Sequence, residues 1–289
     1  MTYAALLVHV EADPSPDPRL ALAVHLANQF NAKLIGVGGE LWSPTAFGGY
    51  YGYGGYGDGY GDSYAAGPLI AAQMAAVEED LKRTEEKFRT AAGEVREGCD
   101  WRGKIQFPLA EVAAQARAAD LVIASQSHRH GGSDYNVALP GVLILQTGRP
   151  VLVVGPDVSR LDVESVLVSW KDTREARRAV TDALPFLLKA EVVQLVEICE
   201  DSAAAPASRA RLEDVAAYLL RHSIKASIKA EISEHRTPAA EQLLHVAERQ
   251  QADLIVAGAY GHNRFQEWVF GGFTRALLTQ TTRAVLFSH

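Results

Sequence analysis

The chain contains the same buried-strand pattern twice, and this repeat restricts the possible fold more than any other feature of the sequence. Residues 119–124 read Ala-Asp-Leu-Val-Ile-Ala, and residues 252–257 read Ala-Asp-Leu-Ile-Val-Ala. A second matching pair, residues 147–154 and 281–288, lies at almost the same offset, 134 residues against 133. Short runs of branched apolar residues are typical of strands buried on both faces of a parallel sheet. The sequence therefore predicts two copies of one strand-and-helix unit.

Around these runs, apolar stretches alternate with segments of helical spacing, which predicts an α/β fold. Strands are expected at residues 4–10, 32–37, 163–170 and 191–198, and helices at residues 20–30, 71–95, 173–188 and 238–250. We expect two tandem, doubly wound, Rossmann-like parallel sheets of about five strands each. With 289 residues, the predicted domains span residues 1–157 and 158–289.

A low-complexity tract of glycine and tyrosine interrupts the first copy at residues 47–64. It has too little aliphatic surface to offset the entropy cost of ordering, so we predict a surface loop. A tyrosine-rich surface that binds a partner or folds over a ligand is the alternative. The G-x-G-x-x-G match at residues 52–57 is accidental, because no strand leads into it and no helix follows. Residues 98–105 are also rejected as a phosphate loop, since they follow a helix and precede a strand.

Composition excludes several functional classes. A net charge of −7 argues against nucleic acid or an anionic membrane as a partner. Cys99 and Cys199 form no CxxC motif, so neither a disulfide framework nor a metal site is predicted. The sequence has no basic leader and no apolar run long enough to span a membrane, which favours the cytoplasm.

Glycines gather around the strand at residues 254–257 and the helix that begins near residue 273. Gly258 and Gly261 follow the strand, and Gly271 and Gly272 open the helix. This arrangement can bring backbone N–H groups and a helix N-terminus to phosphate oxygens. Glycine would be required for positive φ angles and for close approach of the backbone. The same glycines could instead serve only a tight turn and helix–sheet packing.

The spacing Gly258, Gly261, Gly271 resembles the G-2x-G-9x-G-(S/T) signature of the universal stress protein family. Gly272 stands where that family has Ser or Thr, and Thr274 follows two residues later. The resemblance implies strand order 3-2-1-4-5, as in adenine nucleotide alpha-hydrolase-like proteins. It further implies a site for ATP, with Mg²⁺, in the second domain. The implied loop contacts also include Tyr260, His262 and Phe273.

A second resemblance lies after the first strand of the second half. Residues 171–176 are similar to the family's D-G-S-x-x-A turn, whose Asp faces the adenine. An ungapped alignment matches Thr173 to the Ser and places Lys171 at the Asp, whereas a gapped alignment matches Asp172 to the Asp. Lys171 could also reach a phosphate from this strand end.

The first half differs where the chemistry would occur. Ser125-Gln126-Ser127-His128 replaces Gly258-Ala259-Tyr260-Gly261, and Val137-Ala138 falls where Gly271-Gly272 lie. Side chains would obstruct the cradle, so we expect little or no phosphate binding by this half.

Together these features favour a tandem universal stress protein that acts as a regulatory, stress-response module. Neither an H-E-x-x-H nor a G-x-S-x-G motif occurs, so no catalytic residue is assigned. Two alternatives stay open, a non-nucleotide interaction protein of the same fold and a slow ATPase. The resemblance also implies that the two halves pair through their last strands. The remaining possible partner is a second copy of the chain, in a homodimer.

Overall fold

The computed structural model describes residues 2–11, 17–40, 63–126, 139–155, 157–261 and 272–289, with only the backbone for residues 63–70. Its strands are β1 (Ala5–His9), β2 (Lys33–Glu40), β3 (Cys99–Ile105), β4 (Leu121–Ser125), β5 (Val151–Val154), β6 (Ser165–Ser169), β7 (Val192–Cys199), β8 (Ala226–Ile232), β9 (Leu254–Gly258) and β10 (Ala284–Ser288). Its α-helices are α1 (Pro18–Phe30), α2 (Ser63–Ala92), α3 (Pro108–Gln115), α4 (Pro140–Gln146), α5 (Arg174–Asp182), α6 (Leu184–Leu187), α7 (Ala205–Arg221), α8 (Ala239–Arg249) and α9 (Gly272–Gln280).

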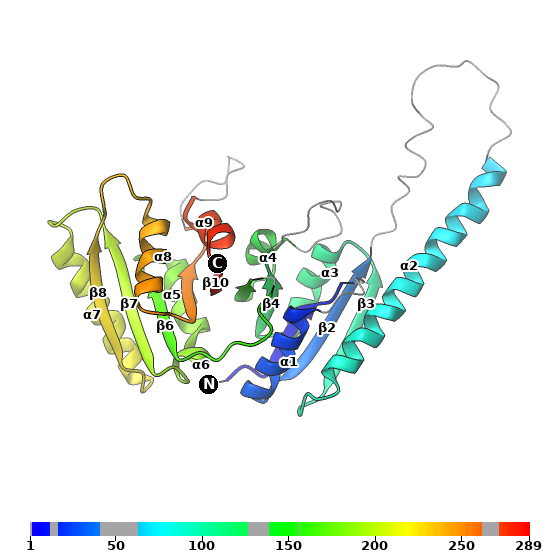
Figure 1. Ribbon diagram of the computed structural model, residues 1–289, viewed down its shortest axis with the longest axis horizontal. Helices are drawn as coiled ribbons and strands as arrows, with labels where there is room; N and C mark the ends of the chain where they lie inside the picture. Colours follow the sequence, from blue (N-terminus) through cyan, green and yellow to red (C-terminus); the bar gives the residue numbers. More distant parts are fainter. Residues whose placement is uncertain (1, 12–16, 41–62, 127–138, 156, 262–271) are drawn as a thin grey trace, which may run out of the picture.

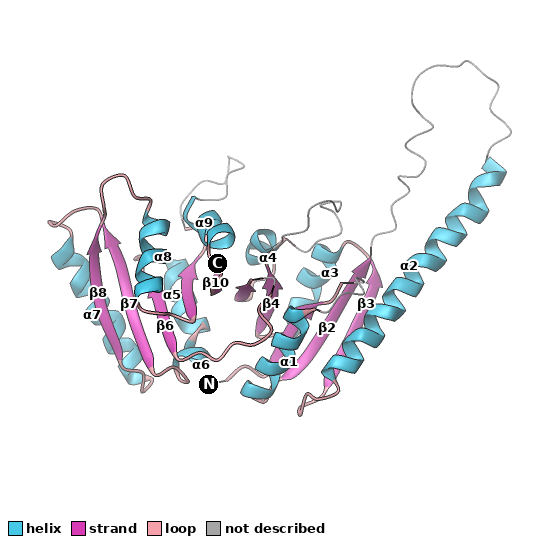
Figure 2. Cartoon of the chain, viewed as in Figure 1, coloured by secondary structure: helices cyan, strands magenta, loops and turns pink. Residues whose placement is uncertain are grey.

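The described strands form one ten-stranded sheet in the order β3-β2-β1-β4-β5-β10-β9-β6-β7-β8. Within each half all neighbouring strands are parallel, and each half repeats the order 3-2-1-4-5, which confirms the predicted fold class. The halves meet where β5 and β10 pair antiparallel, with Leu286 opposite Leu152. Figure 2 shows the sheet running through the whole molecule with helices on both sides.

Two apolar cores lie on opposite faces of this sheet. Helices α1, α2, α5, α6 and α7 pack on one face, and α3, α4, α8 and α9 pack on the other. Because successive strand residues point to opposite faces, Leu6 belongs to the first core and Leu7 to the second. Both are fully buried, as the near-continuous apolar runs of the sequence require. The N-terminal part of α2 extends beyond the sheet (Figure 1).

Aromatic side chains close the seam between the halves. The ring of Tyr3 makes edge contacts with Phe30 of the first half and Phe186 of the second, at centroid distances of 5.0 and 5.6 Å. The Tyr3 hydroxyl donates a hydrogen bond to the Asp182 carbonyl oxygen at 2.6 Å. Burial, followed by the nearby Asp182 carboxylate, raises the pKa of Tyr3 well above its ordinary value, so the phenol stays a donor.

Replacing Tyr3 by Phe removes this one hydrogen bond and keeps the ring contacts. We expect the Tyr3→Phe variant to lose about 1 kcal/mol of unfolding free energy, which is typical of one net hydrogen bond. Chemical denaturation of the variant and the wild type measures the difference. Tyr218→Phe is the control, because the partly exposed Tyr218 makes a ring contact with His222 and its hydroxyl makes no described hydrogen bond. Equal losses in the two variants would contradict the role of the Tyr3 hydroxyl.

Three expected segments differ from the structure. Helix α2 begins at Ser63, so the last two residues of the tract at 47–64 are helical, and residues 47–62 lie outside the described residues. The helix expected at 173–188 is divided into α5 and α6, because Pro185 lacks the N–H that a continuous helix needs. Residues 98–105 were expected to precede a strand. The structure differs, because Cys99–Ile105 form strand β3 itself.

Candidate functional site

A pocket of about 590 Å³ opens at the carboxyl ends of β6, β7 and β9 in the second half. This is where the strand order reverses, because β6 and β9 are neighbours whose connections leave in opposite directions. Its walls come from the loop after β6, the end of β7, the start of α7, the loop after β9 and the start of α9. Predicted site residues that line it are Lys171, Thr173, Gly258, Tyr260, Gly261, Gly272, Phe273 and Thr274. His262 and Gly271 were also predicted and lie outside the described residues.

Gly258 and Gly261 bring the loop after β9 against the first turn of α5. A Cβ on Gly258 would lie 2.5 Å from the Ala176 nitrogen and 2.7 Å from the Glu175 carbonyl carbon, both backbone atoms. A Cβ on Gly261 would lie 2.9 Å from Glu175 Oε2. At Gly258 the close approach of the backbone to α5 requires glycine, which is the helix–sheet packing given above as the alternative to phosphate contact. At Gly261 the nearest atom is the end of the Glu175 side chain.

The expectation of positive φ angles at these two glycines is wrong. The left-handed conformation falls instead on Tyr260, with φ 58°. Its side chain leaves the loop towards the first half, where its hydroxyl donates to the Gly141 carbonyl oxygen at 3.2 Å. Burial raises the pKa of Tyr260 to about 12, so this hydroxyl stays protonated. Tyr260 thus joins the loop to helix α4 of the other half.

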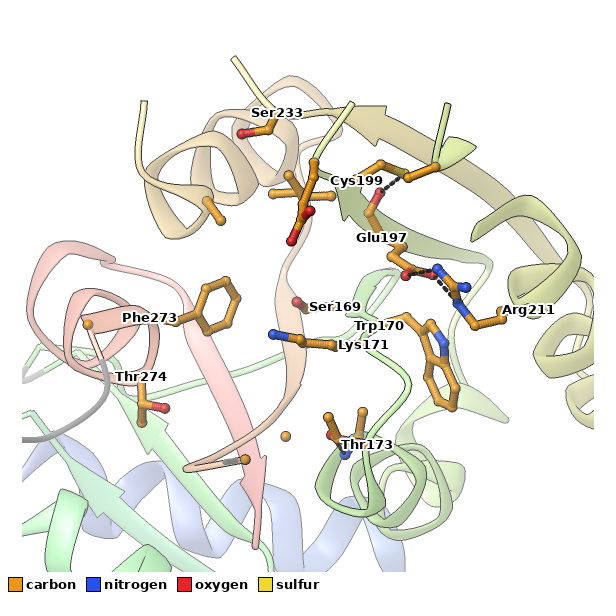
Figure 3. A pocket seen from close by; sticks show the side chains of 18 of the residues that line it. Ser169, Trp170, Lys171, Thr173, Glu197, Cys199, Arg211, Ser233, Phe273 and Thr274 are labelled. Atoms are coloured by element: carbon orange, nitrogen blue, oxygen red, sulfur yellow. Dashed lines mark hydrogen bonds and ion pairs between the residues drawn. The ribbon is translucent and has the colours of Figure 1, made fainter. Parts of the chain in front are cut away.

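The loop after β6 places three predicted residues in different surroundings. Thr173 is the N-cap of α5, and its Oγ1 accepts from the Ala176 N–H at 3.3 Å. The Lys171 side chain points across the pocket towards the α9 side, where Phe273 and Thr274 lie (Figure 3). Asp172 does not line this pocket, and its carboxylate pairs with Arg177 at 2.6 Å. The ungapped alignment matches Lys171 to the family's Asp, and Lys171 lines the pocket. The gapped alignment matches Asp172, which does not line it.

Helix α9 forms the wall opposite α5. Thr274 is buried, whereas no atom of the described residues lies within 4 Å of the place where a Cβ of Gly272 would be. Gly272 lies at the amino end of the helix, where backbone N–H groups have no intrahelical partners.

The far end of the pocket contains charged residues that the sequence analysis missed. Glu197 at the end of β7 accepts two hydrogen bonds from Arg211 of α7, at 2.5 and 3.3 Å. Both residues line the pocket near Cys199 (Figure 3). The exposed Glu200 also lines it. In the sequence, the one sign of this pair was Glu197 itself, an acidic residue near the carboxyl end of an apolar strand. Its partner, fourteen residues later on a helix, has no local signature.

At the equivalent place in the first half, a guanidinium contacts the carboxyl end of the strand. Arg19, in the first turn of α1, donates to Ser125 Oγ at 3.3 Å, at the end of β4. The same guanidinium pairs with Glu11 at 3.2 Å and Asp17 at 3.3 Å. Arg19 occupies the position that Glu175 holds in α5, and Ser125 the position of Gly258. Obstruction of a phosphate cradle in the first half stays a prediction, because residues 127–138 lie outside the described residues.

Comparison with known proteins identifies the second half. Residues 163–289 match the profile of the family described as "Universal stress protein family". The C-terminal half of this chain belongs to the universal stress protein family. A universal stress protein from Archaeoglobus fulgidus matches the whole molecule, with 12% identity, TM-score 0.70, and coverage of 98% of this chain and 97% of its own.

A second full-length match shows the same architecture. A Pseudomonas aeruginosa protein described as functionally unknown has 14% identity and TM-score 0.58, with coverage of 99% of this chain and 92% of its own. At such identities these matches establish only the fold, which both halves of the chain share with these proteins. A comparison with curated proteins found no match.

Two further findings concern the described part of the chain. No described helix is long and apolar enough to cross a membrane. Among the described residues, no cluster of three or more His, Cys, Asp or Glu side chains is arranged to hold a metal ion.

Proposed function

We propose that the second half of this universal stress protein binds an adenine nucleotide and that the chain acts as a regulatory, stress-response module without dedicated catalysis. One observation carries the proposal. Gly258 and Gly261 press the loop backbone against α5 at the edge of a pocket of about 590 Å³. Glycines at these positions, at the carboxyl end of β9 and in a pocket that the start of α9 also lines, are suited to phosphate oxygens.

The residues in the pocket fit a nucleotide of ordinary size. Main-chain N–H groups near Gly261 and Gly272 would take the phosphates, and Lys171 supplies a cation in the pocket. The base would lie towards β7, beside Trp170 and Cys199. Magnesium bound with ATP would neutralise part of the phosphate charge.

We further propose that the chain consists of two universal stress protein domains, residues 1–157 and 158–289. The antiparallel pairing of β5 with β10 supports this division, since it is the one place where the sheet changes direction. One chain would then correspond to a dimer of single domains, in which Arg19 and its partners leave the first site unable to bind nucleotide. Association of two such chains and a cytoplasmic location remain proposals.

Isothermal titration with ATP and Mg²⁺ tests the binding proposal, together with mass spectrometry of nucleotide that co-purifies with the protein. Gly261→Leu should weaken binding by about 10- to 100-fold, because losing one charge-assisted hydrogen bond costs about 1.5–3 kcal/mol. Gly93→Leu is the matched control, since Gly93 is exposed and far from the pocket, and an added Cβ there meets nothing closer than 3.5 Å.

The outcomes separate the alternatives left open by the sequence. Absence of heat with ATP, and of co-purifying nucleotide, would favour a non-nucleotide interaction protein of the same fold. Magnesium-dependent release of phosphate from ATP that disappears in Gly261→Leu would indicate a slow ATPase. Binding that is weakened in Gly261→Leu and retained in Gly93→Leu supports the regulatory module.

A further inference from the structure

A buried carboxylate lies directly beneath the glycine loop. Glu175 is the second residue of α5, and only 4% of its surface is exposed. A Cβ on Gly261 would lie 2.9 Å from its Oε2 and 3.5 Å from Thr173 Oγ1. The carboxylate therefore packs against the backbone that would cradle phosphate.

This carboxylate is ionised at neutral pH. Desolvation acts to raise the pKa of Glu175, but hydrogen bonds from Arg174, from its own backbone N–H and from Thr173 outweigh it and hold the pKa below its usual value. The ion-pair partner Arg174 has a side chain that is 79% exposed, so water screens its charge much more than that of Glu175. The amino end of α5, which would otherwise attract phosphate, thus already holds an anion.

The charged residues of the pocket do not compensate for this anion. Arg211 is engaged by Glu197, and the exposed Glu200 adds another negative charge to the wall. Lys171 is the one lining cation of the described residues for which no ion pair or hydrogen bond is seen. A site built for a bare triphosphate would have a clear excess of positive charge, whereas the described lining residues supply a single uncommitted ammonium group.

We infer that the Glu175 carboxylate repels the phosphates of a bound nucleotide, so that affinity falls as phosphate charge rises. Without divalent cations the pocket then binds a nucleoside monophosphate, held at Lys171, more tightly than a nucleoside triphosphate. This inference rests on the proposed nucleotide binding and names the ligand class of the same site. Each added phosphate extends towards the glycine loop and brings more negative charge to the Glu175 carboxylate. Magnesium bound to ATP would reduce this penalty by neutralising the phosphates.

Titration calorimetry with AMP, ADP and ATP in the presence of a chelator tests this inference. We expect the wild type to bind AMP more tightly than ATP. Glu175→Gln should raise the affinity for ATP by about 10- to 30-fold, the size expected for removing one nearby charge at an intermediate dielectric. The affinity for AMP should change much less. The ratio of the affinity for ATP to the affinity for AMP (the ATP-to-AMP ratio) therefore rises.

Two further variants separate electrostatics from a structural effect. Arg174→Ala removes the partner cation and should lower the ATP-to-AMP ratio, opposite in sign to Glu175→Gln. Glu164→Gln removes an exposed charge before β6, at the opposite end of the strand from the pocket, and should leave the ratio unchanged. A disturbed α5 would move both α5 variants in the same direction.

Each outcome has a separate meaning. Tighter binding of ATP than AMP by the wild type in chelator, with an unchanged ratio in Glu175→Gln, would overturn the inference while leaving nucleotide binding intact. If no variant binds any of the three nucleotides with or without Mg²⁺, the proposed function itself fails. Opposite shifts of the ratio in Glu175→Gln and Arg174→Ala would establish the role of Glu175.

Discussion

Between pH 7 and pH 4 the wild-type protein is expected to lose about 3 kcal/mol more unfolding free energy than a His9→Leu variant, from one buried imidazole. His9 ends strand β1 and is 3% exposed. Neither ring nitrogen has a hydrogen-bond partner among the described residues. Burial first, and then the guanidinium of Arg19, lower the pKa of His9 to about 3.

The direction of the effect follows from the two protonation states. An unfolded chain binds a proton at His9 with the ordinary pKa of 6.5, whereas the folded protein does so only near pH 3. Stability from this residue is therefore complete above pH 6.5 and is lost as the pH falls towards 3. Over this range the free energy changes by about 1.4 kcal/mol per pH unit for one proton.

Urea unfolding followed by tryptophan fluorescence at a series of pH values measures this slope. His9→Leu replaces a buried polar ring by an apolar side chain that takes up no proton. His245→Gln is the control, because His245 is exposed on α8. The prediction fails if wild type and His9→Leu lose stability in parallel between pH 6 and pH 4.

The repeat in the sequence predicted the fold because the sheet buries both faces of its central strands. A run such as Leu254 to Ala257 has to be apolar throughout, so its position and its copy at 121–124 are visible without any structure. Strand β3 was not visible in this way. It lies at the edge of the sheet and carries Asp100, Arg102 and Lys104, whose charges interrupt the apolar run.

The glycine spacing likewise predicted where the pocket lies, because Gly258 and Gly261 meet a constraint of backbone geometry that few residue types satisfy. The charges to which we attribute the ligand preference of the pocket were much harder to predict. Glu175 reads as an ordinary acidic residue in the first turn of a helix, and Arg211 as an exposed helical charge. Their importance depends on packing against Gly261 and Glu197, which only the folded chain brings about.

Placing at Gly258 the residue that the first half carries there should abolish nucleotide binding. In Gly258→Ser the new Cβ would lie 2.5 Å from the Ala176 backbone nitrogen, which cannot move without shifting α5. Overpacking of this kind costs about 1–3 kcal/mol of stability. The shift also displaces the loop from the amino end of α9, so we expect ATP binding to be lost together with the lower melting temperature.

The reverse change separates close approach from the other requirements of the site. Ser125→Gly removes the hydroxyl that Arg19 contacts, but Arg19 stays in place with Glu11 and Asp17. The first half should therefore gain no nucleotide binding, and the protein should keep a single site. Titration of both variants with ATP and Mg²⁺ gives the number of sites directly. A second site in Ser125→Gly would mean that glycine at this strand end is sufficient for binding, and unchanged binding in Gly258→Ser would mean that it is not required.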